Sequence, residues 1–158
     1  MTKAFLRLKK IHSSYLTDQR TMHRHLVSVV IPTFNRRADL LCCVESLSKS
    51  TYRNLEIIVV DNASTDGTSG AVERLYPQIK LVKLEKNTGV TGGRNEGVKL
   101  AEGELVLFLD HDVVADEEMI NELVKVMLKN GNVGVAGPVI YYFDYPTEVW
   151  ASGTFLDI

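Results

Sequence analysis

Apolar segments alternate with helix-like segments along most of this chain, and this alternation limits the fold more than any other feature of the sequence. Runs of β-branched residues are typical of buried strands, whereas apolar residues every three or four positions are typical of helices. We predict strands over "VSVVIP", "LEIIVVD", "IKLVKLE", "ELVLFLD" and "VGVAGPVIYYF", the last being one strand or a bent pair. We predict helices over "ADLLCCVESLSKS", "STDGTSGAVERLY", "VTGGRNEGVKLAEG" and "DEEMINELVKVMLKN". This order predicts an α/β fold, with a mainly parallel sheet covered by helices on both faces.

The chain divides into a basic leader, residues 1–26, and a domain, residues 27–158. The leader holds six lysine and arginine residues against one acidic residue, although the net charge of the whole chain is −2. Such a segment is typical of a poorly ordered terminus. Its "AFLRLKKI" stretch also fits a short amphipathic helix on an anionic membrane surface, and both interpretations stay open. A signal peptide is not predicted, because the leader has neither an uninterrupted apolar region nor a small-residue cleavage site.

Composition disfavours several classes of function. The small negative net charge gives no reason to expect nucleic acid as a partner. No apolar run approaches the roughly 20 residues that a membrane-spanning helix needs. Cys42 and Cys43 are adjacent and cannot bridge each other without unusual strain, so we expect both to be reduced. These features predict a cytoplasmic protein, whose leader is the segment that would contact the inner face of the membrane.

Polar clusters follow each of the first four predicted strands. They read "PTFNR", "DNASTD", "NTGVTGGRNEG" and "DHD" in chain order. In open parallel sheets, ligands bind beyond the carboxyl ends of the strands. We therefore expect all four clusters to open onto one rim of the sheet, where a ligand binds.

The two acids of "DHD" are the sharpest chemical signal. In an extended segment, residues i and i+2 point the same way, so the carboxylates of Asp110 and Asp112 can converge. Two carboxylates placed close together repel each other unless a cation lies between them. Oxygen ligands suit Mg²⁺ or Mn²⁺, and Mg²⁺ is usually held by one or two carboxylates and substrate phosphates. The alternative is that Asp112 begins a loop that Asp110 caps.

Four further features of the predicted rim have a structural interpretation, and two of them also fit a contact with a ligand. Asp61 ends the second strand, where it fits a contact with a ribose or base, or an Asx-turn. Asp66 is expected to cap a helix or stabilise its loop. The "GVTGGRNEG" stretch fits a phosphate site with Arg94 supplying charge, or a glycine turn with close helix packing. His111 is expected to be a structural histidine with its hydrogen bonds satisfied.

The order of these motifs resembles the nucleotide-sugar-binding half of the family 2 glycosyltransferases, which have the GT-A fold. The matching stretches are "VSVVIPTFNR", "LEIIVVDNASTDGT", "NTGVTGGRNEG" and "GELVLFLDHDV", with a weaker match through "VAGPVIYYFDYPTEVWASG". "GGRNEG" is most similar to the rhamnosyltransferase-type branch. The resemblance implies metal-dependent transfer of a sugar, with inversion, from a UDP- or dTDP-sugar to a hydroxyl of a glycan or lipid-linked acceptor. Cell-envelope polysaccharide synthesis is the implied setting.

The resemblance also implies which residues receive the nucleoside. Pro32, Thr33 and Asn35 would line the nucleoside pocket at the end of the first strand. Asp61 would hold the base or the ribose.

The remaining matches concern the diphosphate, the sugar and the metal. Arg94 and Asn95 would help position the nucleotide and its diphosphate. Asp110 would face the ribose or sugar, while Asp112 would coordinate Mg²⁺ or Mn²⁺.

The sequence departs from the family pattern in one respect. Family members usually run well past 158 residues, and their general base lies in an acidic motif that has no match here. We therefore expect the donor-binding half of such an enzyme, as a truncated chain or a fragment, with the isolated chain inactive for lack of that base. Exposure of the strand near residues 141–150 would then favour a homodimer.

Three other classes of protein share parts of this sequence pattern. A non-catalytic module that binds a nucleotide or nucleotide-sugar stays open. A nucleotidyltransferase is disfavoured, because "PTFNRRADL" contains no glycine for a phosphate loop. A flavodoxin-like receiver domain is disfavoured too, because the first strand lacks the acidic cluster that would accept a phosphate.

Overall fold

The computed structural model describes residues 4–7, 24–129 and 132–152, and residues 4–7 are described by their backbone. The chain forms two compact units. The parallel-sheet unit comprises His25–Val44 and Asn54–His111, and the mixed-sheet unit comprises Met1–Arg24, Glu45–Arg53 and Asp112–Ile158.

The parallel-sheet unit contains the four strands that the sequence predicts most clearly. They are β2 (Val27–Thr33), β3 (Leu55–Asp61), β4 (Lys80–Lys83) and β5 (Leu105–Phe108). Their order is β4-β3-β2-β5, and every neighbouring pair is parallel. The predicted parallel sheet is therefore confirmed.

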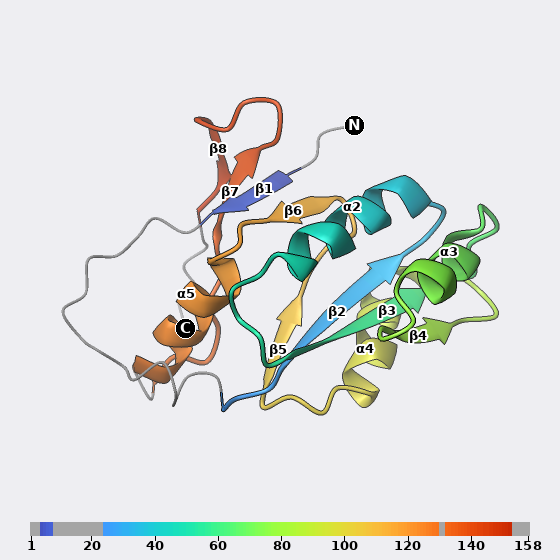
Figure 1. Cartoon of the computed structure of the whole chain (residues 1–158), viewed down its shortest axis with the longest axis horizontal. Coiled ribbons are helices and arrows are strands. Elements are labelled where there is room, and N and C mark those ends of the chain that lie inside the picture. Colours follow the sequence, from blue (N-terminus) through green and yellow to red (C-terminus); the bar gives the residue numbers. More distant parts are fainter. Residues whose placement is uncertain (1–3, 8–23, 130–131, 153–158) are drawn as a thin grey trace. The chain divides into compact units, whose positions relative to one another are not determined.

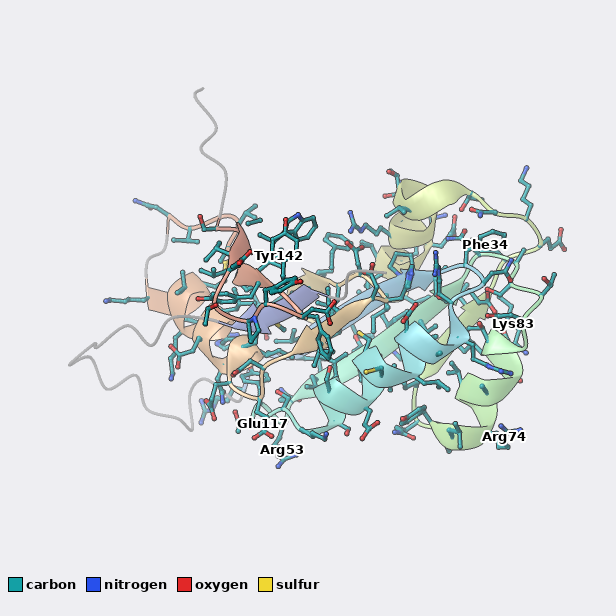
Figure 2. All side chains as sticks on the ribbon, turned by 90° about the horizontal axis from the view of Figure 1, so that it is seen from above. Phe34, Arg53, Arg74, Lys83, Glu117 and Tyr142 are labelled. Carbon is teal, nitrogen blue, oxygen red and sulfur yellow. The ribbon has the colours of Figure 1, made fainter. Side chains whose placement is uncertain are left out.

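Helices cover both faces of this sheet. They are α3 (Thr68–Leu75), α4 (Gly89–Lys99) and the first part of α2 (Arg37–Ser48). Figures 1 and 2 show α4 on one face, and α2 and α3 on the other. The central strands are buried on both sides, since every residue of β2 is buried, as expected for a parallel sheet between two helical layers.

The α4 helix lies close to the sheet at two of its four glycines, Gly93 and Gly97. A Cβ atom added at Gly97 would lie 2.3 Å from Cγ1 of Val30 and 3.2 Å from Cγ2 of Val60. Both valines are fully buried and belong to the apolar core with Ile58. Only a residue without a side chain allows the helix to approach the sheet at this distance.

A polar network joins the amino-terminal ends of the strands. The Glu56 carboxylate accepts hydrogen bonds from the Ser28 hydroxyl at 2.5 Å and the Glu102 amide at 2.7 Å. It also pairs with the Lys80 ammonium at 2.8 Å. Burial has the largest single effect and raises the pKa of Glu56, but the hydrogen bonds from Lys80, Ser28 and Glu102 together lower that pKa below its ordinary value.

The mixed-sheet unit has a second sheet. Its strands are β6 (Val113–Ala115), β1 (Ala4–Arg7), β7 (Val139–Tyr142) and β8 (Val149–Ala151), in the order β6-β1-β7-β8. β1 is parallel to β6 and antiparallel to β7, and β7 is antiparallel to β8. The unit also contains α5 (Met119–Lys129), and Figure 1 labels all five elements.

Two predictions differ from this arrangement. Within "AFLRLKKI", residues Ala4–Arg7 form strand β1 and not a helix, because their backbone pairs with two neighbouring strands. The rest of the leader up to residue 23 lies outside the described residues. The fifth predicted strand begins only at Val139 and belongs to the mixed sheet. It starts directly after Pro138, whose ring nitrogen has no hydrogen to donate to a sheet.

Among the helices of the described residues, none combines the length and the apolar character that crossing a membrane requires.

The close approach of α4 makes a stability prediction. Gly97→Ala should lower the free energy of unfolding by about 1–3 kcal/mol, because the new methyl group overlaps Val30. The matched control is Gly70→Ala in α3, where an added Cβ meets nothing within 4 Å. That control should raise stability by up to about 1 kcal/mol, through helix propensity alone. Urea unfolding measures both, and equal effects would contradict the packing argument.

The Glu56 network makes a prediction about pH. The pKa of Glu56 in the folded state lies below its ordinary value of 4.5. The ionised carboxylate therefore stabilises the fold at pH values above 4.5. This stabilisation is lost as the pH falls through the folded-state pKa. Glu56→Gln should therefore be less stable than the unsubstituted chain near neutral pH, with the difference shrinking as the solution is acidified.

Unfolding midpoints in urea across the acid range test this prediction. Glu85→Gln, at an exposed glutamate beyond β4, is the control and should change little at any pH. A constant gap between Glu56→Gln and the unsubstituted chain would contradict the proposed role of the charge.

Candidate functional site

The carboxyl ends of β2 and β3 lie side by side and carry predicted site residues. Thr33 and Asp61 are register partners at the last positions of the two strands, and each is 2% exposed. The hydroxyl oxygen of Thr33 is buried and has no hydrogen-bond partner among the described residues. A buried polar atom without a partner is uncommon, and it marks a place where a ligand atom or a water would be stabilised.

The Asp61 carboxylate is held by its own loop. Oδ1 accepts the backbone N–H of Ser64 at 2.9 Å, and Oδ2 accepts the hydroxyl of Ser69. This bond stabilises the loop, as the structural interpretation of Asp61 expects, but it reaches the N–H three residues on and not two as in an Asx-turn. A ligand contact at Asp61 would therefore add a hydrogen bond to a carboxylate that is already fixed in place.

The loops after β2 and β3 are joined through Asn35. Its backbone N–H donates to the Ser64 hydroxyl at 2.9 Å, and its side-chain oxygen accepts the Thr65 N–H at 2.8 Å. Asn35 has φ 51° and Ala63 has φ 65°. Positive φ is uncommon outside glycine, and such conformations concentrate at binding sites. Figure 2 shows Phe34, which precedes Asn35 in the chain, and Lys83, the last residue of β4, at the same end of the parallel-sheet unit.

Asp66 joins the starts of two helices, as the prediction of a loop-stabilising residue requires. Its carboxylate accepts the N–H of Arg37 at 3.0 Å, where α2 begins, and that of Thr68 at 3.1 Å, where α3 begins. Burial is the largest effect and raises the pKa of Asp66, but the hydrogen bonds from Thr68 and Arg37 outweigh it and lower that pKa. The carboxylate therefore stays ionised between two positive helix ends.

The glycine-rich stretch serves close packing. A Cβ at Gly93 would lie 2.7 Å from Nδ2 of Asn62 and 3.0 Å from Cβ of Pro32. Since α4 already begins at Gly89, Gly92 and Gly93 lie inside the helix and not in a loop before it. The amide of Gly93 is therefore bonded within the helix, while a phosphate site at the amides of the first turn of α4 stays a prediction.

Arg94 and Asp110 form an ion pair. Nη2 of Arg94 lies 2.7 Å from Oδ1 of Asp110, and the guanidinium carbon lies 5.7 Å from the centre of the Phe108 ring. The Arg94 side chain is 35% exposed and that of Asp110 is 55% exposed. Nε of Arg94 is buried and has no hydrogen-bond partner in the described part of the chain. Two residues predicted from separate motifs thus contact each other, whereas Asn95, on the same helix, is exposed.

The "DHD" residues differ in their surroundings. The His111 ring nitrogen Nδ1 lies 3.2 Å from the Pro32 carbonyl oxygen, as a structural histidine would. Asp112 is exposed directly before β6. No group of three or more His, Cys, Asp or Glu side chains suited to a metal occurs within the described ranges. An exposed carboxylate such as that of Asp112 fits a Mg²⁺ or Mn²⁺ ion whose other ligands would come from a diphosphate and water.

Sequence reasoning missed Asn62. Its side chain is buried, its Oδ1 accepts the N–H and hydroxyl of Thr88 at 3.2 and 3.0 Å, and its Nδ2 donates to the Gly89 carbonyl oxygen at 3.3 Å. Its place directly after Asp61 at a strand end was the only signal available.

Comparison with known proteins agrees with this geometry. The glycosyl transferase family 2 profile matches residues 28–156. The chain is 34% identical over 110 residues to the Escherichia coli UDP-Glc:alpha-D-GlcNAc-diphosphoundecaprenol beta-1,3-glucosyltransferase WfgD, covering 69% of this chain and 44% of that enzyme. The chain spans less than half the length of the curated relatives it matches.

Solved structures with related folds carry nucleotides. The S. aureus TarS 1-349 complex with UDP has a TM-score of 0.61 and 30% identity, over 70% of this chain and 38% of TarS 1-349. The mannosyltransferase PcManGT from Pyrobaculum calidifontis, in complex with GDP-Man and Mn2+, has a TM-score of 0.60 and 30% identity, over 64% of this chain and 32% of its own. The rhamnosyltransferase-type branch stays a prediction. The parallel sheet, its helical layers and these matches together show that the chain belongs to glycosyl transferase family 2, with the GT-A fold.

Proposed function

We propose that this chain supplies the donor-binding part of a metal-dependent glycosyltransferase, which moves a sugar from a nucleotide-diphospho-sugar to an acceptor hydroxyl with inversion at the anomeric carbon. The observation that carries the proposal is the Arg94–Asp110 pair in the same unit as the carboxyl ends of β2 and β3. A guanidinium suits a diphosphate because its N–H groups form paired hydrogen bonds with phosphate oxygens. Thr33 and Arg94 each keep one buried polar atom without a partner among the described residues.

Each predicted residue receives a role under this proposal. Pro32, Thr33 and Asn35 contact the nucleoside, and Asp61 accepts a hydrogen bond from the base or ribose. Arg94 and Asn95 receive the diphosphate, and Asp110 contacts the ribose or the sugar.

In the proposed reaction, the acceptor oxygen attacks the anomeric carbon as the bond to the diphosphate oxygen breaks on the opposite face. The hydroxyl proton passes to a general base, a role that we assign to none of the described residues. A divalent cation supplies positive charge that stabilises the departing diphosphate. Asp112 is the residue we propose to hold that cation.

The names of relatives suggest the substrates. WfgD is named for a UDP-glucose donor and a diphosphoundecaprenol-linked acceptor, so we propose a UDP- or dTDP-sugar as donor and a lipid-linked glycan as acceptor. A membrane contact through the basic leader and a homodimer remain part of the proposal.

Nucleotide binding tests the donor site. By calorimetry, the chain should bind UDP or dTDP, and Mn²⁺ should tighten that binding about tenfold or more, because Asp112 would hold the ion and its charge would offset that of the diphosphate. Asp112→Asn should lose the effect of Mn²⁺ and keep the weaker metal-free binding. Asp144→Asn, at an exposed aspartate of the β7–β8 connection, is the matched control. Absence of binding to UDP, dTDP and GDP would contradict the proposed function.

Arg94 makes a second prediction. Arg94→Gln should weaken UDP binding about tenfold or more, because a charged hydrogen-bond donor to phosphate is lost. Uridine, which has no phosphate, should bind to this variant within about twofold of the unsubstituted affinity. Lys99→Gln is the control, since Lys99 lies on the same helix and pairs with Glu96. Equal losses for UDP and uridine would assign Arg94 to the nucleoside and not to the diphosphate.

A further inference from the structure

The Asn62 side chain bridges the end of β3 and the start of α4. Its oxygen accepts two hydrogen bonds from Thr88, and its amide nitrogen donates one to the Gly89 carbonyl oxygen. Asn62 is 3% exposed, so solvent does not compete for these bonds. An asparagine side chain offers both a donor and an acceptor, and here each is bonded to the same short segment.

A second contact lies one turn further along the helix. The Asn62 amide group occupies the space that a Cβ of Gly93 would fill, at 2.7 Å. A Cβ at Gly92 would lie 2.4 Å from the Thr88 hydroxyl oxygen, which is one of the donors to Asn62. The two glycines before Arg94 therefore leave room for Asn62 and Thr88.

These two contacts fix both the start of α4 and its rotation at Gly93. Arg94 follows Gly93 directly, so its Cα position depends on the same contacts. The guanidinium is then held by Asp110 at 2.7 Å and lies over the Phe108 ring. Within the described part of the chain, Asn62 makes no hydrogen bond with Arg94 or Asp110.

We infer that Asn62 is a positioning residue, which acts through Thr88, Gly89 and Gly93 to hold Arg94 where a donor diphosphate is received. The inference rests on the proposed function for the identity of the ligand. Asn62 follows Asp61 directly in the chain. The end of β3 therefore carries Asp61, the proposed nucleoside contact, and also positions Arg94, the proposed diphosphate contact. Substitution of Asn62 should then weaken binding of the diphosphate and spare binding of the nucleoside.

The binding test uses Asn62→Ala in the full chain with UDP and uridine as probes. UDP affinity should fall about tenfold, and uridine affinity should stay within about twofold. The double variant Asn62→Ala/Arg94→Gln should bind UDP no more weakly than Arg94→Gln, because Asn62 acts through that side chain. Equal losses for both probes, or additive losses in the double variant, would overturn the inference.

A ligand-free measurement separates this inference from the proposed function. The Nε–H signal of Arg94 in proton–nitrogen NMR spectra should shift or broaden in Asn62→Ala. Ser28→Ala is the control for general loss of stability, because Ser28 is equally buried but lies in the Glu56 network. It should leave the Arg94 signal unchanged. An unaltered Arg94 signal in folded Asn62→Ala would overturn the inference, even if the chain binds no nucleotide.

Gly93→Ala provides a second variant in case Asn62→Ala does not fold. The added methyl group displaces the Asn62 amide without removing it. It should reproduce the selective loss of UDP affinity and the change in the Arg94 signal. A Gly93→Ala chain that folds and binds UDP like the unsubstituted protein would contradict the role of this contact.

Discussion

The contact between α4 and the parallel sheet is the constraint on which the candidate site depends. Gly93 and Gly97 allow the helix backbone to lie against Pro32, Val30 and Val60. A helix held further out would carry Arg94 with it and break the 2.7 Å contact to Asp110. Because Gly93 and Gly97 have no side chains, α4 can both cover the valine core and place Arg94 beside Asp110. Within the glycine-rich stretch, Gly93 and Gly97 therefore act by close packing.

Short polar side chains hold the rim together. Asn35, Asn62 and Asp66 each bond backbone groups of a different segment, so three loops are fixed without an apolar core of their own. Loops carry backbone donors and acceptors that must find partners, and asparagine and aspartate supply them locally. The positive φ angles of Asn35 and Ala63 persist because these bonds hold both loops. A site of this kind is formed before any ligand arrives, which reduces the entropy lost on binding.

Much of the fold could be predicted from the sequence, because strands β2 to β5 and their helices have strong local patterns. The rule that strand ends share one rim predicted that Arg94 and Asp110 would lie near each other. Their ion pair was not predicted, and the ligand roles of both residues stay predictions. The pairing of Ala4–Arg7 with β6 and β7 could not be predicted, since it depends on partners more than 100 residues away. Asn62 was missed for a similar reason. Its partners Thr88 and Gly89 are distant in sequence, and a single asparagine after a strand is typical of any turn.

The Glu56 network and the candidate site occupy opposite ends of the same strands. Ser28 is the second residue of β2 and Thr33 is its last, so they lie roughly 16 Å apart at about 3.3 Å per residue. Substitutions at such separations usually have independent effects on stability. Under the proposed function, a substitution that changes which nucleotide-sugar binds at one end of the strands would leave the stabilising network at the other end unaltered.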